Sequence, residues 1–257
     1  MRNFVNKDSV VRQIWGKGDT VLFIFAGAAA EFALNKAVDW LYFTGRLPAD
    51  PIGRLFSTVT YARRIVFADW ESAHKAIDHI TFIHKKVEES RGAVIPDWAY
   101  RDVLFMLIYY SIAAFEVLER KLTPAEKDEV FDVFYRVGHR MGLKDLPRNY
   151  TDWLQARNSH LHNDLERTNY TVHLMQQYKK HLGKARYFLL LQVQAMLVPT
   201  VVKKALHLPA PLVGKSLLLA YKSSRFIKAE SLVKSLLLPN AYKSQIKQLD
   251  QPLIYQS

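Results

Sequence analysis

The apolar residues of this chain recur mostly three or four positions apart, which is the period of an α-helix. The clearest such stretch is Trp70 to Glu89, which contains neither Gly nor Pro. One face of this predicted helix carries Ala73, Ile77, Ile80, His84 and Val87. His84 therefore lies in line with an apolar stripe, whereas His74 and His79 project elsewhere. An imidazole in such a stripe either packs in the core or offers a nitrogen to a buried iron.

Similar periodicity predicts helices along most of the chain. They cover residues 21–43, 51–68, 98–118 and 123–141, a segment that starts at Asn149 or Thr151, and a segment from Arg186 that ends or kinks before Pro199. Few runs alternate with period two, and there are only 10 Gly and 10 Pro to make tight turns. The pattern therefore predicts an all-α fold, a single multi-helix globular domain around a central buried helix.

Residues 21–43 form the predicted central helix. The stretch is long enough to span a bilayer, but Glu31, Asn35, Lys36 and Asp39 interrupt it. A charge at the centre of a spanning helix costs roughly several kcal/mol. Glu31, Asn35 and Asp39 are spaced by four, so they are expected to form one polar stripe that lines a cavity or pairs with neighbouring helices. We expect a helix wrapped by other helices.

The net charge of +12 is concentrated in the C-terminal third of the chain. From Tyr178 onward there are 13 Lys and Arg residues against two acidic residues, whereas the preceding 177 residues hold 23 basic and 22 acidic residues. A basic block is typical of proteins that bind nucleic acid, an anionic membrane surface or an acidic partner. A solvated protein face is the alternative. Nucleic acid is the weakest of these interpretations, because no recognisable binding module accompanies the block.

A stiff Leu208-Pro209-Ala210-Pro211 linker predicts two parts, a helical domain over 1–207 and a basic amphipathic segment over 208–257. Within residues 215–238, Leu218, Phe226, Val233 and Leu237 oppose Lys215, Lys222, Arg225, Lys228 and Lys234. We expect this segment to dock on the domain, with an anionic membrane surface contacted through 215–257 as the alternative. Residues from Asn240 onward are expected to be irregular.

The first 20 residues are polar and mixed, so we expect no signal peptide and a cytoplasmic protein, or one held at a membrane periphery. The chain has no cysteine, which excludes disulfides, iron–sulfur clusters and thiolate-bound haem or zinc. A bound metal must take its ligands mainly from His, carboxylate, Tyr or Lys. Glycine-rich phosphate loops, GxSxG and HExxH are also absent from the sequence.

Two groups of polar residues lie within otherwise apolar helices. Arg54, Arg63 and Arg64 accompany Thr58, a set that can hold haem propionates or phosphate by charge-assisted hydrogen bonds, or form surface ion pairs. Tyr109 and its neighbour Tyr110 place phenols in the 98–118 helix, where a buried phenol usually finds a hydrogen-bond partner.

Four short motifs carry a family resemblance. They are Arg54-Leu55-Phe56-Ser57-Thr58, His84-Lys85-Lys86-Val87, the Leu122–Glu126 helix start and the Gly142–Pro147 stretch. In this order and spacing they resemble the family of bacterial latex-clearing rubber oxygenases and the ER-bound oxygenase of the mycophenolic acid pathway. The resemblance covers roughly residues 18–183.

The resemblance implies an all-helical domain that holds haem b and attacks an apolar substrate, including isoprenoid double bonds, with O₂. His84 matches the histidine that the family would use as the axial iron ligand. Arg54 and Thr58 match the pair that would lie beside the haem, and Arg64 and Tyr109 are further candidates for cofactor contact.

The chain also departs from the family pattern. Glu88 and Glu89 follow the His-x-x-Val segment where many members have Arg-Gly, and residues 98–120 lack the histidine of a Trp-x-His segment. The ligand position is intact, but the surrounding pocket differs. The alternative hypothesis is therefore a non-catalytic helical protein that binds haem, lipid or a partner at a membrane surface.

Overall fold

The helices begin and end where the local sequence supplies caps and breaks. The Thr123 hydroxyl accepts a hydrogen bond from the Glu126 backbone N–H at 3.3 Å, and the Glu126 carboxylate accepts one from the Thr123 N–H at 2.8 Å. This is the predicted capping box. Asp69 and Asn149 each cap a helix in the same way, by accepting from a backbone N–H three residues on.

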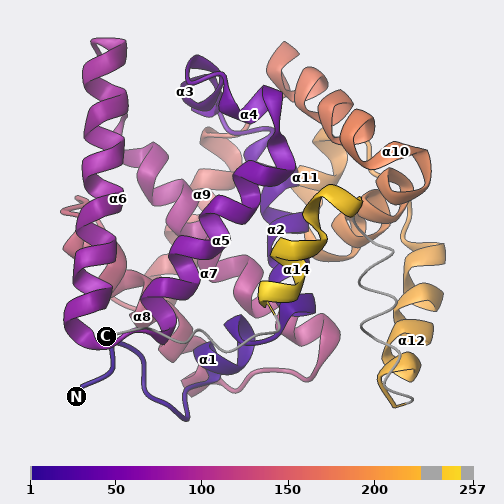
Figure 1. Cartoon of the computed structure of the whole chain (residues 1–257), viewed down its shortest axis with the longest axis horizontal. Coiled ribbons are helices and arrows are strands. Elements are labelled where there is room, and N and C mark those ends of the chain that lie inside the picture. Colours follow the sequence, from indigo (N-terminus) through magenta and orange to yellow (C-terminus); the bar gives the residue numbers. More distant parts are fainter. Residues whose placement is uncertain (1, 227–238, 250–257) are drawn as a thin grey trace.

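The computed structural model describes residues 2–226 and 239–249. All regular elements within these residues are helices (Figure 1), which confirms the predicted all-α fold. The elements are α1 (Val10–Trp15), α2 (Gly18–Phe32), α3 (Val38–Phe43), α4 (Arg46–Ala49), α5 (Pro51–Phe67), α6 (Trp70–Arg91), α7 (Asp97–Leu118), α8 (Pro124–Arg140), α9 (Tyr150–Asn163), α10 (Asn169–Leu197), α11 (Thr200–Ala205), α12 (Leu212–Phe226), the 3₁₀ helix η1 (Asn240–Tyr242) and α14 (Lys243–Leu249).

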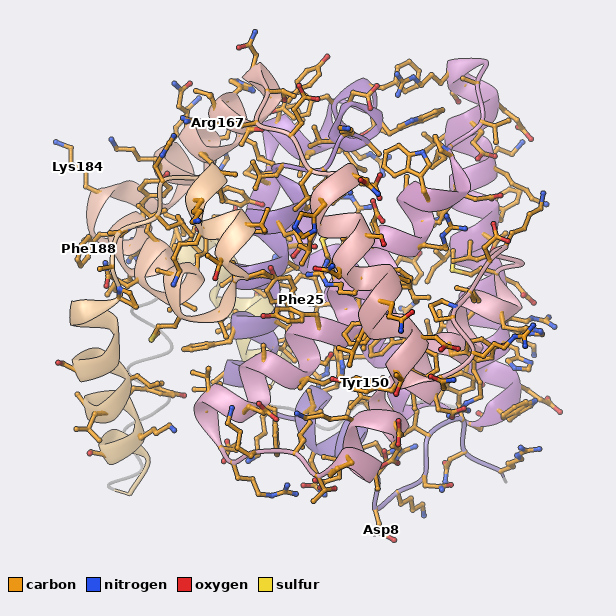
Figure 2. All side chains as sticks on the ribbon, turned by 180° about the vertical axis from the view of Figure 1, so that it is seen from behind. Asp8, Phe25, Tyr150, Arg167, Lys184 and Phe188 are labelled. Carbon is orange, nitrogen blue, oxygen red and sulfur yellow. The ribbon has the colours of Figure 1, made fainter. Side chains whose placement is uncertain are left out.

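Helix α2 runs through the middle of the molecule and packs most extensively on α7 (Figure 1). Its small residues allow this approach, because a Cβ atom added at Gly27 would lie 2.3 Å from the Tyr110 ring on α7. Ile24 and Ala30 are fully buried, and Phe25 points into the interior (Figure 2). The predicted central buried helix is therefore present over residues 18–32.

The prediction of one continuous helix over 21–43 is wrong. Helix α2 ends at Phe32, and α3 begins at Val38. In between, the Asn35 side chain accepts from the Ala37 N–H at 2.8 Å, and the backbone also bonds to a distant segment. The Leu34 carbonyl accepts from the Glu166 N–H at 2.7 Å, and the Lys36 N–H donates to the Asp164 carbonyl at 2.9 Å.

The break also separates the predicted polar stripe. Glu31 and Asn35 are buried together at the end of α2, whereas Asp39 on α3 pairs with Arg91 on α6 at 2.6 Å. The sequence left open whether these side chains line a cavity or pair with neighbouring helices. In the structure all three bond to neighbouring helices. None of the helices in the described ranges has the length and apolar composition needed to cross a membrane.

The described parts of the basic C-terminal segment contact the rest of the molecule. On α12 the Tyr221 hydroxyl donates to Asp19 at 2.8 Å, and on η1 the Tyr242 hydroxyl donates to Asp50 at 2.6 Å. Residues 243–249 are helical, so the expectation of irregular structure there is wrong. The predicted amphipathic positions Lys228, Val233, Lys234 and Leu237 lie outside the described residues, as do the side chains of Lys215, Arg225 and Phe226.

Replacing Gly27 by alanine tests the close packing of α2 on α7. Helix propensity alone would make Gly27→Ala more stable by about 1 kcal/mol. The clash with Tyr110 instead predicts a protein that is less stable by about 1–3 kcal/mol. The sign of the change in unfolding free energy, measured by denaturant titration, decides between the two, and a gain in stability would contradict the packing described.

Candidate functional site

His84 lies on the inward face of α6, as its place in the apolar stripe predicts. Asp69 caps the start of the helix, and Ala73 and Ile77 are fully buried along the same face. His84, two turns further on, is half-buried, and its ring meets the edge of the Tyr100 ring with the centroids 5.1 Å apart. The stripe thus places the imidazole between α6 and α7.

The His84 Nδ1 atom is buried and has no hydrogen-bond partner among the described residues. Burial and the positive charge of Arg54 lower the pKa of His84 to about 4, although Glu88 opposes the shift. The imidazole is therefore neutral at pH 7. A neutral imidazole with a free nitrogen is the form of histidine that binds a metal ion.

Arg54 and Thr58 lie one turn apart on α5, which packs against α6. The Arg54 guanidinium donates to the Thr58 hydroxyl at 2.9 Å, so the threonine holds the cation in place. No carboxylate pairs with Arg54 in the part of the chain that the structure describes. Burial and the charge of Arg46 lower the pKa of Arg54. Three of the predicted site residues, Arg54, Thr58 and His84, are thus neighbours.

The other two predicted site residues lie elsewhere. Arg64 is exposed on α5, with its guanidinium 6.0 Å from the Tyr61 ring. Tyr109 is on α7, where its hydroxyl donates to the Leu197 carbonyl at 3.4 Å and the Arg157 guanidinium lies 4.9 Å from its ring. Tyr109 therefore belongs to a second group of polar residues, centred on Glu31.

The Glu31 carboxylate is fully buried where α2, α7 and α9 meet. It accepts hydrogen bonds from both terminal nitrogens of Arg157 and from the Tyr110 hydroxyl at 2.8 Å, and it lies 3.0 Å from His160 Nε2. Burial alone would raise the pKa of Glu31, but the charge of Arg157 and the bonds from His160 and Arg157 lower it to about 2. Glu31 is therefore a permanent anion in the core.

His160 connects Glu31 to a second buried carboxylate. Its Nδ1 lies 2.7 Å from Asp102 Oδ1 and 3.5 Å from Asp164 Oδ2, and Asp102 also accepts from the Asn35 amide at 2.9 Å. Burial lowers the pKa of His160, but the contacts with Asp102 and Glu31 outweigh it and raise the pKa to about 9. His160 is thus an imidazolium between carboxylates, opposite in charge to His84.

Asp102, His160 and Asp164 form a group that could hold a metal ion. Their ligand atoms all lie within 4.8 Å of one another, and one imidazole with two carboxylates suits a divalent cation. His160 Nδ1 and Asp102 Oδ1 are 2.7 Å apart, close enough for an ion pair, but their angles do not meet the geometry of a hydrogen bond. A protonated His160 already neutralises Asp102, so a metal ion would have to displace that proton.

Sequence reasoning identified Glu31 and Asn35 as a polar stripe but not the partners of Glu31. Arg157 and His160 are three residues apart on α9, which places both on one helix face, and Asp102 is an acid within an apolar helix. The spacing on α9 and the acid on α7 each indicate that polar side chains are buried there. They do not show that the two helices meet at Glu31, because that contact joins residues 126 and 129 positions apart.

The structure is thus a helical domain with a neutral histidine on one helix, whose buried Nδ1 has no partner among the described residues, and a charged core on three others. A family model described as "ER-bound oxygenase mpaB/B'/Rubber oxygenase, catalytic domain" matches residues 12–224. The chain belongs to this family, as its motifs predicted, and has the catalytic domain of an oxygenase family. A comparison with curated proteins gives no match, and a comparison with solved structures gives none either.

Removing Arg157 tests the role of the buried ion pair. Arg157→Met leaves Glu31 as a buried charge without its main partner, and this costs about 3–5 kcal/mol of stability. Arg140→Met is the matched control, because the Arg140–Asp78 pair has similar geometry at 2.6 Å but is about half exposed. It should cost less than about 1 kcal/mol. Equal losses in unfolding free energy for the two variants would contradict the assignment.

The two histidines should titrate at opposite ends of the pH scale. The folded-state pKa of His160 lies above the ordinary value of about 6.5, so its contribution to stability is complete below pH 6.5 and is lost as pH rises through about 9. Stability should fall by roughly 3 kcal/mol over that window. Histidine-detected NMR should show His160 titrating near pH 9 and His84 near pH 4. A His160 that loses its proton below pH 7 would contradict the network described.

Proposed function

We propose that the protein is a haem-b-dependent oxygenase that acts with O₂ on an apolar substrate, such as one with isoprenoid double bonds. The observation that carries the proposal is the state of His84. It is neutral, its Nδ1 is buried without a partner among the described residues, and it lies beside Arg54 in an oxygenase catalytic domain. His84 would be the axial ligand of the iron.

The side chains around His84 fit a haem group in their chemistry. Arg54 has no carboxylate partner among the described residues, and a guanidinium binds a propionate through paired, charge-assisted hydrogen bonds. Thr58 keeps that guanidinium in place through the 2.9 Å bond. The bound haem would supply the capacity to activate O₂.

The surface beside α6 is also suited to apolar groups. Phe43 at the end of α3 is 49% exposed, and Phe82 on α6 is 54% exposed. Arg91 stacks over Trp40 at 4.0 Å and so links α3 to the end of α6. His84 lines neither the cavity at the bend of α10 nor the one beside Tyr109, so the proposed haem would not occupy either of these two cavities.

One departure from the family pattern, Glu88, has a structural role in this chain. The Glu88 carboxylate accepts from the Tyr100 hydroxyl at 3.1 Å and from the Ile95 N–H at 2.9 Å, and thereby fixes the turn between α6 and α7. Burial and Glu88 raise the pKa of Tyr100 well above its usual value, so the phenol stays protonated. Tyr100 would position the His84 ring and exclude water from it.

The second candidate function is a non-catalytic protein that binds haem, lipid or a partner. It is favoured by the absence of a histidine from residues 98–120, where many family members carry one. In its haem-binding form the second candidate shares His84 with the first, and the two then differ in whether O₂ reacts. Oxygen consumption by the haem-loaded protein in the presence of isoprenoid substrates distinguishes them.

Haem reconstitution tests the shared part of both functions. The purified chain incubated with haem should show a Soret band, and His84→Ala should lose it because the iron loses its axial ligand. His79→Ala is the matched control, since His79 lies on the same helix but is exposed. It should keep the band. Wild-type protein that stays colourless, or a His84→Ala protein with an unchanged spectrum, would overturn the proposal.

A further inference from the structure

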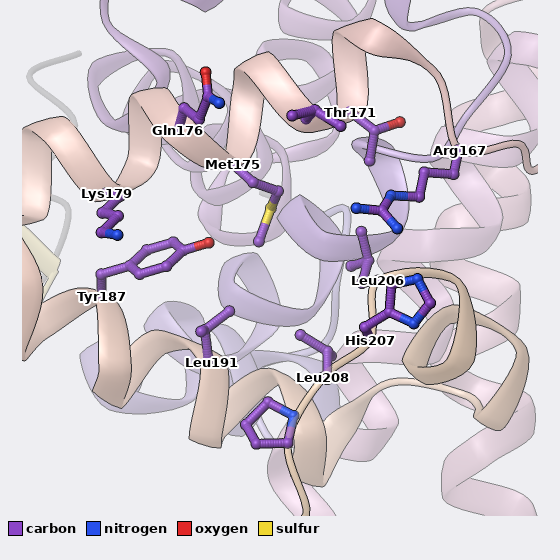
Figure 3. A pocket seen from close by; sticks show the side chains of 12 residues that line it. Arg167, Thr171, Met175, Gln176, Lys179, Tyr187, Leu191, Leu206, His207 and Leu208 are labelled. Atoms are coloured by element: carbon purple, nitrogen blue, oxygen red, sulfur yellow. The ribbon is translucent and has the colours of Figure 1, made fainter.

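A break in α10 creates a cavity far from His84 in the sequence. Gly183 has φ 76° and ψ 168°, so α10 consists of two arms that meet at an angle. Figure 3 shows the arms on two sides of the cavity, with the turn at residues 206–209 on a third. Its volume is about 280 Å³. This is just below the range of roughly 300–1,000 Å³ typical of small-molecule sites.

Three side chains that line the cavity are Arg167, Lys179 and His207. Arg167 and His207 lie close together at one end, and Lys179 lies on the arm at the other end (Figure 3). None of the three side chains forms a hydrogen bond or an ion pair with another residue in the part of the chain that the structure describes. All three side chains are exposed, and two cations with an imidazole around one cavity favour an anionic ligand.

The space between the basic ends is largely apolar. Met175 and Leu191 extend from the two arms of α10, and Leu206 and Leu208 come from the turn (Figure 3). The Tyr187 hydroxyl points toward Met175 between them. A ligand that fills this space must carry an apolar body as well as its charge. At about 30 Å³ for each water-sized group, it has about nine or ten heavy atoms.

The backbone of His207 is a second sign of a built site. It has φ 53°, the left-handed conformation that is costly for a residue with a side chain. The Leu208 N–H donates to the Lys203 carbonyl and the His207 N–H to the Lys204 carbonyl. His207 is therefore the residue just after the C-cap of α11, a position usually taken by Gly or Asn. The chain thus places an imidazole at the cavity where glycine would be more stable.

We propose that this cavity binds a short amphipathic monocarboxylate, whose carboxylate lies on Arg167 and His207 and whose chain lies on the Met175 and Leu191 side. A single guanidinium fork matches a carboxylate bidentately. The apolar walls disfavour a strongly hydrated dianion such as free phosphate. The site shares no lining residue with the group around His84, so it is independent of the proposed oxygenase function.

Calorimetric titration of the full chain with octanoate tests the proposal. We expect one site per chain with a Kd below about 1 mM. Arg167→Gln should weaken binding at least tenfold. Lys184→Gln removes the same charge from the outer side of α10 (Figure 2) and should leave binding unchanged. No saturable binding, or equal weakening by both variants, would overturn the proposal.

Two further measurements locate the ligand and identify what is recognised. Octanoate should shift the NMR signal of the Met175 methyl group, whereas 1-octanol and inorganic phosphate should bind at least tenfold more weakly. His207→Gly should raise the melting temperature by about 2–4 °C, because the strain is relieved, and yet weaken octanoate binding. An unmoved Met175 signal, equal binding of 1-octanol, or undiminished binding by His207→Gly would each overturn the assignment.

Discussion

The fold depends on one buried carboxylate. Glu31 on α2 is held by Arg157 and His160 from α9 and by Tyr110 from α7. A charge removed from water costs several kcal/mol unless each partner is in place, so this anion permits only one arrangement of the three helices. Gly27, one turn before it, lets Tyr110 approach closely enough to donate. The small Gly27 and the charged Glu31, one turn apart on α2, therefore both contribute to the packing of α7 on α2.

The same constraint separates the roles of the histidines. His160 is drawn into the core by carboxylates on both sides and is kept protonated there. His84 lies beside a cation instead, and burial together with the charge of Arg54 lowers its pKa and keeps it neutral. Only His84 combines a neutral ring with a buried nitrogen that has no partner among the described residues and no ion-pair contact. The core network thus holds α2, α7 and α9 together, and the groups that we propose to hold a haem lie outside it, on α5 and α6.

Local features of the fold could be predicted from the sequence, and non-local ones could not. The stripe that contains His84 and the Thr123 capping box depend on residues within a few positions of each other. The end of α2 could not be predicted, because residues 33–37 leave the helix to bond with residues 164–166. The family motifs gave Arg54, Thr58 and His84 as candidates, whereas the partners of Glu31 emerge only when α9 is seen to cross α2.

Chemical rescue of a His84→Gly variant tests the central claim most directly. Without its imidazole the variant should bind haem poorly and lack the Soret band of the wild-type protein. Added imidazole should restore the band by occupying the space left by the side chain, while the same addition to an exposed-site variant, His79→Gly, should change nothing. A His84→Gly protein that shows the wild-type spectrum without imidazole would contradict the assignment of His84 as the axial ligand.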